Sequence, residues 1–338
     1  MRRAVLVLVL LLAAPVHAQV AVSVALTPDG DALANQIGIT AQELATRIRD
    51  RVNDAYGASD ADGFLRSFAD AIAFSMRGLG VDYASDPESL VLGIGANFAV
   101  AASEEVSATE RPTASLAANI AFMAGLNLAG QGAPRWTLFG NGFYRNGSTR
   151  SLRGGIASFG LHAQYRVMNP QPDRGPAAVL RWTGIDVTGG IELTRWSLGV
   201  EDTIETDFTV EGSSGSAALA LASAGTFDLS STTATLPIEV STGVRVALLL
   251  SIYVGVGVDV TTGTGKVNAN LPGTLRGDDG RELGTVEITG SADASASPLA
   301  GRILAGVQLN LWKIKVYAQV NGSSTPAASV GFGIRGVL

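Results

Sequence analysis

The last quarter of the chain alternates between apolar and polar residues with a period of two. Apolar residues share one parity from Leu299 to Leu309 and again from Ile314 to Val320, and a third run extends from Ala328 to Leu338. A period of two places successive side chains on opposite faces of a β-strand. The pattern therefore predicts three strands, each with one apolar face and one polar face.

The same alternation recurs through most of the chain before this point. The predicted strands cover Leu90–Ala101, Ala114–Leu128, Arg135–Arg145, Leu152–Val167, Val179–Leu193, Trp196–Val210, Ser216–Ser230, Ala234–Leu248 and Ser251–Thr262. Together with the last three they give twelve strands, and ten are the main alternative if Glu201–Ser231 forms a hairpin extension. The stretch Gly263–Pro298 is long and rich in Gly, Ser, Asp and Thr, so we expect an external loop there.

One uncharged stretch, Thr113–Pro134, has 22 residues and is long enough for a membrane-spanning helix. Its large apolar residues are mostly even-numbered, as at Leu116 and Ile120, whereas polar residues such as Asn119 are odd-numbered. This period of two favours a strand, with a spanning helix as the alternative.

The first residues have the pattern of a secretory signal peptide. Met1–Ala18 contains two arginines, then an uncharged run over Ala4–Pro15, and ends in small residues. The run is shorter than the ~20 residues that a spanning helix requires, which disfavours the alternative of a membrane anchor. We expect cleavage after Ala18.

A signal peptide followed by alternating strands, with the apolar Leu338 at the end of the last one, resembles bacterial outer-membrane β-barrel proteins. The resemblance is one of architecture and covers residues 90–338. It implies an all-β fold, an antiparallel transmembrane β-barrel of about twelve strands (about 10–14), in which ring closure leaves the last strand without an open edge. It also implies location in the outer membrane, with outer-membrane lipid and the barrel-assembly machinery as partners. Many such barrels end in an aromatic residue, where this chain has Leu338.

Residues 19–89 are expected to form a helical segment between the signal peptide and the barrel. Thr40 and Glu43 have the spacing of a capping box, which predicts a helix over 41–56. A second amphipathic helix is predicted over 61–77. Three arrangements remain open: the two helices pack on each other beneath the barrel, they enter or cap the lumen as a plug, or one lies on the membrane surface.

Composition excludes several classes of function. The chain has no cysteine, which rules out disulfides, thiol catalysis and thiolate metal sites. Removal of Arg2 and Arg3 with the signal peptide leaves 22 of the 24 basic residues against 30 acidic ones, a net charge of −8, so no nucleic-acid partner is expected. Charged residues make up 16% of the chain, against about 25% in soluble domains, as expected if half of the strand residues face lipid.

Catalytic and metal chemistry has little support in the sequence. His162 is the only histidine after signal removal, which excludes a multi-histidine zinc site, and no metal or cofactor is expected. Outer-membrane phospholipases and lipid A deacylases, to which the chain is similar in architecture, carry a His-x-Ser pair. The sequence here is His162-Ala163-Gln164, so the nucleophile is missing and we expect no enzyme.

Charged residues of the polar parity are expected to line the barrel lumen. Acidic residues lie on the middle strands and basic residues mostly on the last three, so opposite charges would face each other across the lumen. They either form salt bridges that fill a closed interior or produce a transverse field across a narrow pore. The candidate lumen-lining residues are His162, Arg166, Asp186, Glu192, Glu239, Arg245, Asp259, Arg302, Lys315 and Arg335.

These patterns predict an outer-membrane barrel that acts as a channel or transporter for small solutes, with the helical N-terminal segment under or in the lumen. The alternatives are a non-conducting structural barrel, a secreted soluble β-protein and a lipid-modifying enzyme. The sequence does not predict an oligomeric state.

Overall fold

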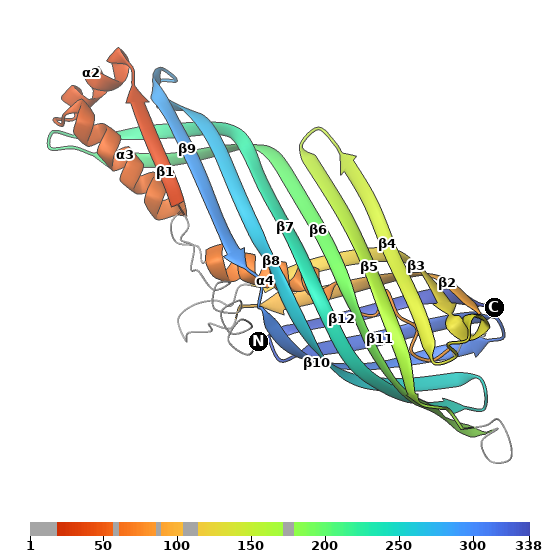
Figure 1. The fold of residues 1–338 in the computed structure, drawn as a ribbon. Coiled ribbons are helices and arrows are strands. Elements are labelled where there is room, and N and C mark those ends of the chain that lie inside the picture. The colour runs from red at the N-terminus through yellow and green to blue at the C-terminus, as the bar shows by residue number, and fades with distance from the viewer. Residues whose placement is uncertain (1–18, 57–60, 86–88, 104–113, 172–178) are drawn as a thin grey trace.

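Ten antiparallel strands close into a barrel (Figure 1). The computed structural model describes residues 19–56, 61–85, 89–103, 114–171 and 179–338. The strand order around the ring is β8-β10-β11-β12-β2-β3-β4-β5-β6-β7, and β7 pairs with β8 to complete it. The ring strands are β2 (Leu90–Ala102), β3 (Ala114–Asn127), β4 (Trp136–Ser148), β5 (Leu152–Met168), β6 (Leu180–Glu211), β7 (Ser216–Val246), β8 (Leu250–Gly277), β10 (Leu299–Leu311), β11 (Ile314–Ser323) and β12 (Ala327–Val337). The predicted transmembrane β-barrel architecture is confirmed.

The period of two in the sequence becomes the two faces of the barrel wall. At the junction of β12 and β2, Phe98 pairs with Val330 and Ile94 with Ile334, and all four side chains are exposed on the outer face. Between them Asn97 points inward and is fully buried. Thr113–Pro134 likewise contains β3 and a short 3₁₀ turn, η1 (Leu128–Gln131), instead of a spanning helix. Among the described residues, none of the helices is long and apolar enough to cross a membrane.

Three strands are far longer than the barrel wall needs, which explains why ten strands and not twelve close the ring. β6, β7 and β8 have 32, 31 and 28 residues. Beyond the ring, β6 and β7 continue as a hairpin in which Glu201–Glu211 pairs with Ser216–Thr226. This hairpin is the extension that the sequence allowed as an alternative.

The external loop expected at Gly263–Pro298 is wrong. This stretch holds the last part of β8 and the strand β9 (Glu282–Ser295), which pair along their length and add to the extended hairpin. Its glycines, serines and threonines suggested a loop, but Val286 and Ile288 alternate with polar residues and are buried. The barrel wall therefore continues on one side into a projecting sheet (Figure 1).

The first described residues also form a strand, which corrects the expectation that residues 19–89 are helical throughout. β1 (Gln19–Leu26) pairs antiparallel with β9, with Val22 opposite Ile288. The helices α2 (Pro28–Gln36) and α3 (Ala41–Tyr56) follow. We call β1, α2, α3, β9 and the projecting parts of β6, β7 and β8 the projecting subdomain.

The capping box at the start of α3 forms as predicted. The Thr40 amide donates to Glu43 Oε2 at 2.8 Å, and the Glu43 amide donates to Thr40 Oγ1 at 3.2 Å. These hydrogen bonds, the backbone one first, hold the pKa of the Glu43 carboxyl below its ordinary value. The cap therefore weakens only when the pH falls through this lowered pKa.

One face of the projecting sheet is covered by α2 and α3. Their apolar residues, including Leu44 and Ile48, are fully buried against Leu219 and Leu275 of the sheet. The side chains of α3 also cap strand backbone, since Arg49 Nε donates to the Val22 carbonyl at 3.1 Å. The projecting subdomain thus has an apolar core of its own, built from residues 22–48 and residues 208–288.

The helix α4 (Ala61–Phe74) lies apart from α2 and α3, inside the mouth of the barrel (Figure 1). Leu65 and Ile72 are buried against inward-facing residues of the wall, and the Phe68 ring meets the Trp196 ring edge-on at 5.3 Å. The arrangement of two helices packed on each other beneath the barrel is therefore wrong, because each helix packs on a different part of the sheet.

We predict that an arginine introduced on the outer face of the sheet lowers the free energy of unfolding only where the strand belongs to the barrel, and not in the projecting subdomain. Val256 on β8 is 60% exposed between Ile303 and Val240. In lipid, Val256→Arg should lower the free energy of unfolding by about 2–4 kcal/mol.

Asn268→Arg is the matched control, because Asn268 is exposed on the same face of the same strand but lies in the projecting subdomain. It should change stability by less than about 0.5 kcal/mol. Denaturant unfolding in vesicles measures both variants, and equal effects would mean that the exposed apolar belt does not face lipid.

Candidate functional site

The centre of the barrel is filled by a segment of the chain itself. Residues 75–85, which we call the plug segment, continue from α4 through the lumen. Gly78 has φ +79°, a left-handed conformation that favours glycine, and an added Cβ there would lie 2.7 Å from the Gln319 side chain. At Gly80 an added Cβ would lie 2.6 Å from His162 Nε2. Both glycines let the backbone approach the barrel wall closely.

The course of the segment is fixed at both ends of the barrel. At the end that carries the projecting subdomain, Ser67 Oγ of α4 lies 2.8 Å from Ser115 Oγ of β3. Ser115 pairs in the sheet with Ala101, near the end of β2. At the other end Gln308 donates to Ser85 Oγ at 3.0 Å, and the Ser89 amide donates to the Leu338 carbonyl. The chain therefore crosses the whole lumen before β2 begins.

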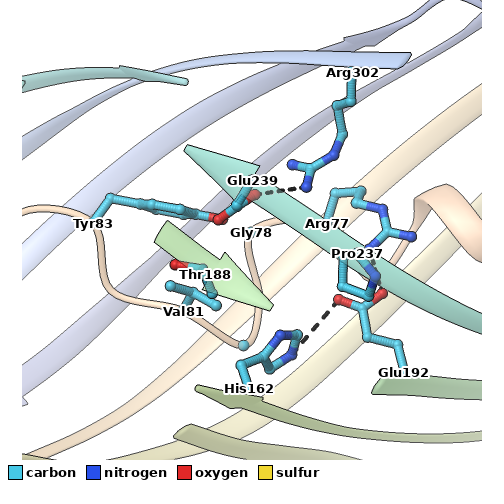
Figure 2. Close-up of a pocket in the computed structure, with 11 residues that line it drawn as sticks. Arg77, Gly78, Val81, Tyr83, His162, Thr188, Glu192, Pro237, Glu239 and Arg302 are labelled. Carbon is cyan, nitrogen blue, oxygen red and sulfur yellow. Dashed lines mark hydrogen bonds and ion pairs between the residues drawn. The ribbon is translucent and has the colours of Figure 1, made fainter. Parts of the chain in front are cut away.

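Arg77 is the centre of the polar contacts in the lumen (Figure 2). Its guanidinium lies 2.5 Å from Glu192 Oε2 on β6 and 3.1 Å from Asp259 Oδ2 on β8, and its side chain is 2% exposed. His162 Nε2 lies 3.7 Å from the other oxygen of Glu192. A cation from the plug segment thus joins two strands of the wall.

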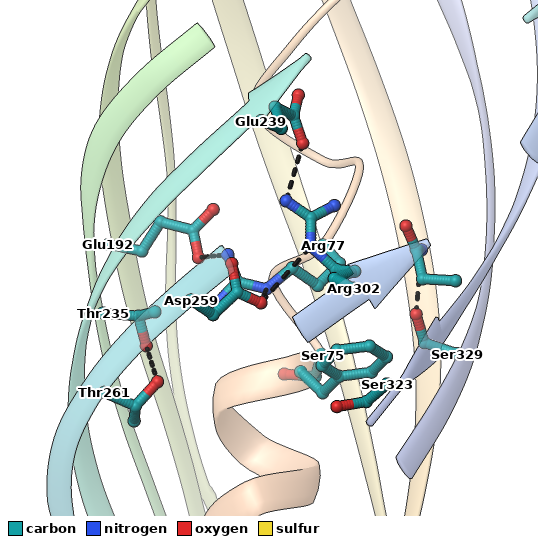
Figure 3. A network of polar contacts seen from close by, with 12 residues as sticks. Ser75, Arg77, Glu192, Thr235, Glu239, Asp259, Thr261, Arg302, Ser323 and Ser329 are labelled. Carbon is teal, nitrogen blue, oxygen red and sulfur yellow. Dashed lines mark hydrogen bonds and ion pairs between the residues drawn. The ribbon is translucent and has the colours of Figure 1, made fainter. Parts of the chain in front are cut away.

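A second arginine extends this arrangement into a network (Figure 3). Arg302 on β10 contacts Glu239 on β7 at 2.6 Å and Asp259 at 3.2 Å. Asp259 therefore lies between Arg77 and Arg302. We call Arg77, Glu192, Glu239, Asp259 and Arg302 the lumen charge cluster. Its two cations and three carboxylates are all buried, so each charge depends on its neighbours for the solvation that water would otherwise provide.

A separate ion pair holds the plug segment nearer the opposite end. Arg335 lies 3.2 Å from Asp82 Oδ1, donates to the Val81 carbonyl at 2.7 Å, and stacks 3.8 Å from the centre of the Tyr317 ring. Asp82 in turn accepts hydrogen bonds from the amides of Ala84 and Ser85. Both charged side chains are completely buried.

Uncharged side chains complete the attachment. Asn97 Nδ2 lies within hydrogen-bonding distance of the carbonyls of Phe74, Ser75 and Arg77, at 3.3, 3.0 and 3.0 Å. The Tyr83 ring stacks on the ring of Tyr253, which faces inward from β8, and the two ring centroids are 5.3 Å apart. Backbone carbonyls released at the end of α4 are thereby satisfied by the wall.

Little space remains in the lumen. Two cavities border the plug segment, each of about 10 Å³, one beside the lumen charge cluster and the other between Asp82, Arg166 and Arg245. Such a volume accommodates about one water molecule. Within the described part of the chain, no group of three or more His, Cys, Asp or Glu residues is arranged to hold a metal ion.

The predicted lumen-lining residues fall into three groups. His162, Glu192, Glu239, Asp259, Arg302 and Arg335 are buried around the plug segment. Arg166 and Asp186 form a partly buried pair at 3.3 Å, and Arg245 donates to the Ala84 carbonyl at 3.0 Å, nearer the end of the barrel opposite the projecting subdomain. Lys315 is half-buried and donates to the Trp312 carbonyl at the same end, away from the cluster.

The sequence placed Arg77 at the end of the helix predicted over 61–77, which in the structure ends at Phe74, and it assigned no role to Asp82 or Tyr83. They lie between a helix and a strand, where neither the helical period nor the strand period applies. The available signal is chemical: this short stretch places an arginine and an aspartate among apolar residues and glycines, and buried charges of this kind need partners elsewhere in the chain.

We predict that Arg77→Ala lowers the free energy of unfolding by about 3–5 kcal/mol, because Glu192 and Asp259 would lose their buried partner. Arg153→Ala is the control. Arg153 pairs with Glu201 and Asp228 on the outer surface and is 52% exposed, so its removal should cost about 0–1 kcal/mol. Heat-modified gel mobility and denaturant titration measure both. A small effect at Arg77 would show that the plug segment is not held by charge.

The chain has weak structural similarity to several solved bacterial proteins. The translocator domain of the autotransporter NalP from Neisseria meningitidis is 11% identical, with 82% of this chain and 100% of that chain covered at a TM-score of 0.37. A Pseudomonas aeruginosa FadL homologue is 9% identical, covering 81% of this chain and 98% of that one at a TM-score of 0.23. Ail, the attachment invasion locus protein of Yersinia pestis, is 11% identical, covering 74% and 95% at 0.22.

At these TM-scores the strand pairing of the chain itself, and not the likenesses, defines its fold. A search of curated proteins found no match. A family model, in contrast, spans nearly the whole sequence. The model described as Lsa36-like matches residues 15–337, and the chain therefore belongs to the Lsa36-like family.

Proposed function

We propose that this protein is a non-conducting outer-membrane barrel that is sealed by its own N-terminal segment and presents the projecting subdomain at the cell surface. The observation that carries the proposal is the filled lumen. The plug segment is held by the lumen charge cluster and by the Arg335–Asp82 pair, and two cavities that border it, lined by described residues, have volumes of about 10 Å³ each. A barrel of this kind anchors and presents a structure without providing a passage.

The outer surface supports a position within a membrane. Large apolar side chains are exposed around all ten ring strands, as at Leu116, Ile238 and Phe332. Aromatic residues lie near both edges of this belt: Trp136 and Tyr165 pack at 4.9 Å near one edge, and Tyr144 is 72% exposed near the other. A belt bounded by aromatic residues is typical of membrane barrels.

The two ends of the barrel differ in a way that supports one orientation. At the end that carries Leu90 and Leu338, the described connections, among them the turns at residues 247–249 and 312–313, add no strand beyond the ring. The projecting subdomain occupies the other end. Bacterial outer-membrane barrels have short periplasmic turns and longer extracellular segments. By this rule residues 19–56 lie outside the cell, on the opposite side of the membrane from Leu338.

A channel for small solutes, the first function expected from the sequence, would require the plug segment to leave the lumen. That movement would expose buried charges of the cluster and break the hydrogen bonds of Asn97 to three backbone carbonyls. The geometry therefore favours the non-conducting alternative.

We predict that the intact protein gives no steady current in a planar lipid bilayer. A variant in which residues 61–85 are replaced by a Gly/Ser linker of the same length should conduct, because the linker can still reach β2 but makes none of the contacts that hold the plug segment in the ring, and it serves as the positive control. Arg77→Ala combined with Arg335→Ala is a milder control and should produce brief openings. Steady current through the intact protein, of the size given by the linker variant, would contradict the proposal.

We also predict the sidedness of the chain, which the absence of native cysteine makes simple to measure. Ala32→Cys on α2 and Lys313→Cys in a short turn are both exposed positions. A membrane-impermeant maleimide should label Ala32→Cys on intact cells and Lys313→Cys only after the outer membrane is opened. The reverse pattern would place the projecting subdomain in the periplasm.

A further inference from the structure

The outer face of the barrel is hollowed where the ring passes into the projecting subdomain. The depression has a volume of about 520 Å³ and is lined by residues of β4, β5, β6, β7 and β8. On the side of the groove nearer the barrel centre lie Phe159, Leu193 and Ala234, which are neighbours across the sheet. Ala234 and the nearby Ala157 are small, so the larger side chains beside them rise around a groove.

The lining of this groove is mostly apolar. Its one charged residue, Arg195, lies at the edge nearer the projecting subdomain. Arg195 pairs through its backbone with Ala157 on one side and Thr232 on the other, and its side chain is exposed. It makes no hydrogen bond or ion pair with any residue that the structure describes. Arg153 also faces outward and lies closer to the projecting subdomain. Unlike Arg195, it forms ion pairs with Glu201 and Asp228.

The groove lies at the border between the apolar belt and the polar surface. Toward the barrel centre the outward positions are apolar, such as Leu161 on β5 and Leu236 on β7. Toward the projecting subdomain they become polar, as at Ser197 and Ser230, which pair with each other. In a membrane, this height is the boundary between acyl chains and headgroups in the leaflet on the side of the projecting subdomain.

We propose that the groove binds an anionic, phosphate-bearing lipid of that leaflet, with an acyl chain along Phe159, Leu193 and Ala234 and the phosphate at the Arg195 guanidinium. The argument is charge complementarity at a fixed height. A guanidinium presents several N–H donors to phosphate oxygens in a planar fork, and an apolar hollow directly below it accepts the chain of the same molecule. This inference rests on the proposed position of the protein in a membrane.

The test uses the full-length protein folded in detergent micelles, to which phosphatidylglycerol or phosphatidylcholine is added. Native mass spectrometry counts the lipid that stays bound. The intact protein should retain phosphatidylglycerol in preference, because the choline cation of phosphatidylcholine already offsets the charge of its phosphate, and Arg195→Gln should reduce this preference about fivefold. Ala234→Trp, which fills the groove, should reduce the retention of both lipids.

Arg276→Gln is the matched control, because Arg276 is an exposed arginine of β8 in the projecting subdomain, away from the groove. It should leave retention unchanged. Equal retention of the two lipids by the intact protein, or equal behaviour of Arg195→Gln and Arg276→Gln, would overturn the proposed site, as would full retention by Ala234→Trp.

Heat-modified gel mobility of every variant separates these outcomes from failure of the barrel. If the variants keep the mobility of a folded barrel but show no lipid preference, only the lipid site is refuted. If the intact protein shows no heat-modifiable barrel in detergent, the proposed function fails with it.

Discussion

The burial of charge in the lumen is the constraint on which the rest of this structure depends. Asp259 lies between two arginines, one from the barrel wall and one from the plug segment. Without Arg77, the wall would hold three buried carboxylates against the single cation Arg302, an arrangement that a low-dielectric interior disfavours strongly. The wall and the plug segment therefore complete each other. Residues 75–85 supply the buried partners of the wall carboxylates Glu192 and Asp259, through Arg77, and of the wall cation Arg335, through Asp82.

This mutual dependence links the two ends of the molecule. The plug segment precedes β2 in the sequence at one end and follows α4 at the end that carries the projecting subdomain. The long strands β6, β7 and β8 join the same two regions through the wall. The projecting subdomain is thus attached to the barrel both through the wall and through the lumen, which gives it a defined orientation on its support.

The sequence was sufficient for the barrel because lipid on one side and a polar interior on the other impose a period of two on every ring strand. It also gave the inward side of residues such as Glu192, Asp259 and Arg302, whose parity alone places them there. It was insufficient for β1 and β9. Their pairing depends on a partner 266 residues away, as for Val22 and Ile288, and no local pattern encodes such a distance. The plug segment has no period at all, and its role follows only from the carboxylates that surround Arg77.

The pairing of β1 with β9 also determines when the projecting subdomain can exist. A chain synthesised only as far as β8 has no partner for its first strand, and closing a loop of this length carries an entropic cost that only the finished sheet offsets. The apolar residues of α2 and α3 would remain exposed until then. Completion of the outermost part of the molecule is therefore a late event that reports on the arrival of nearly the entire polypeptide, so truncated chains cannot display the mature surface.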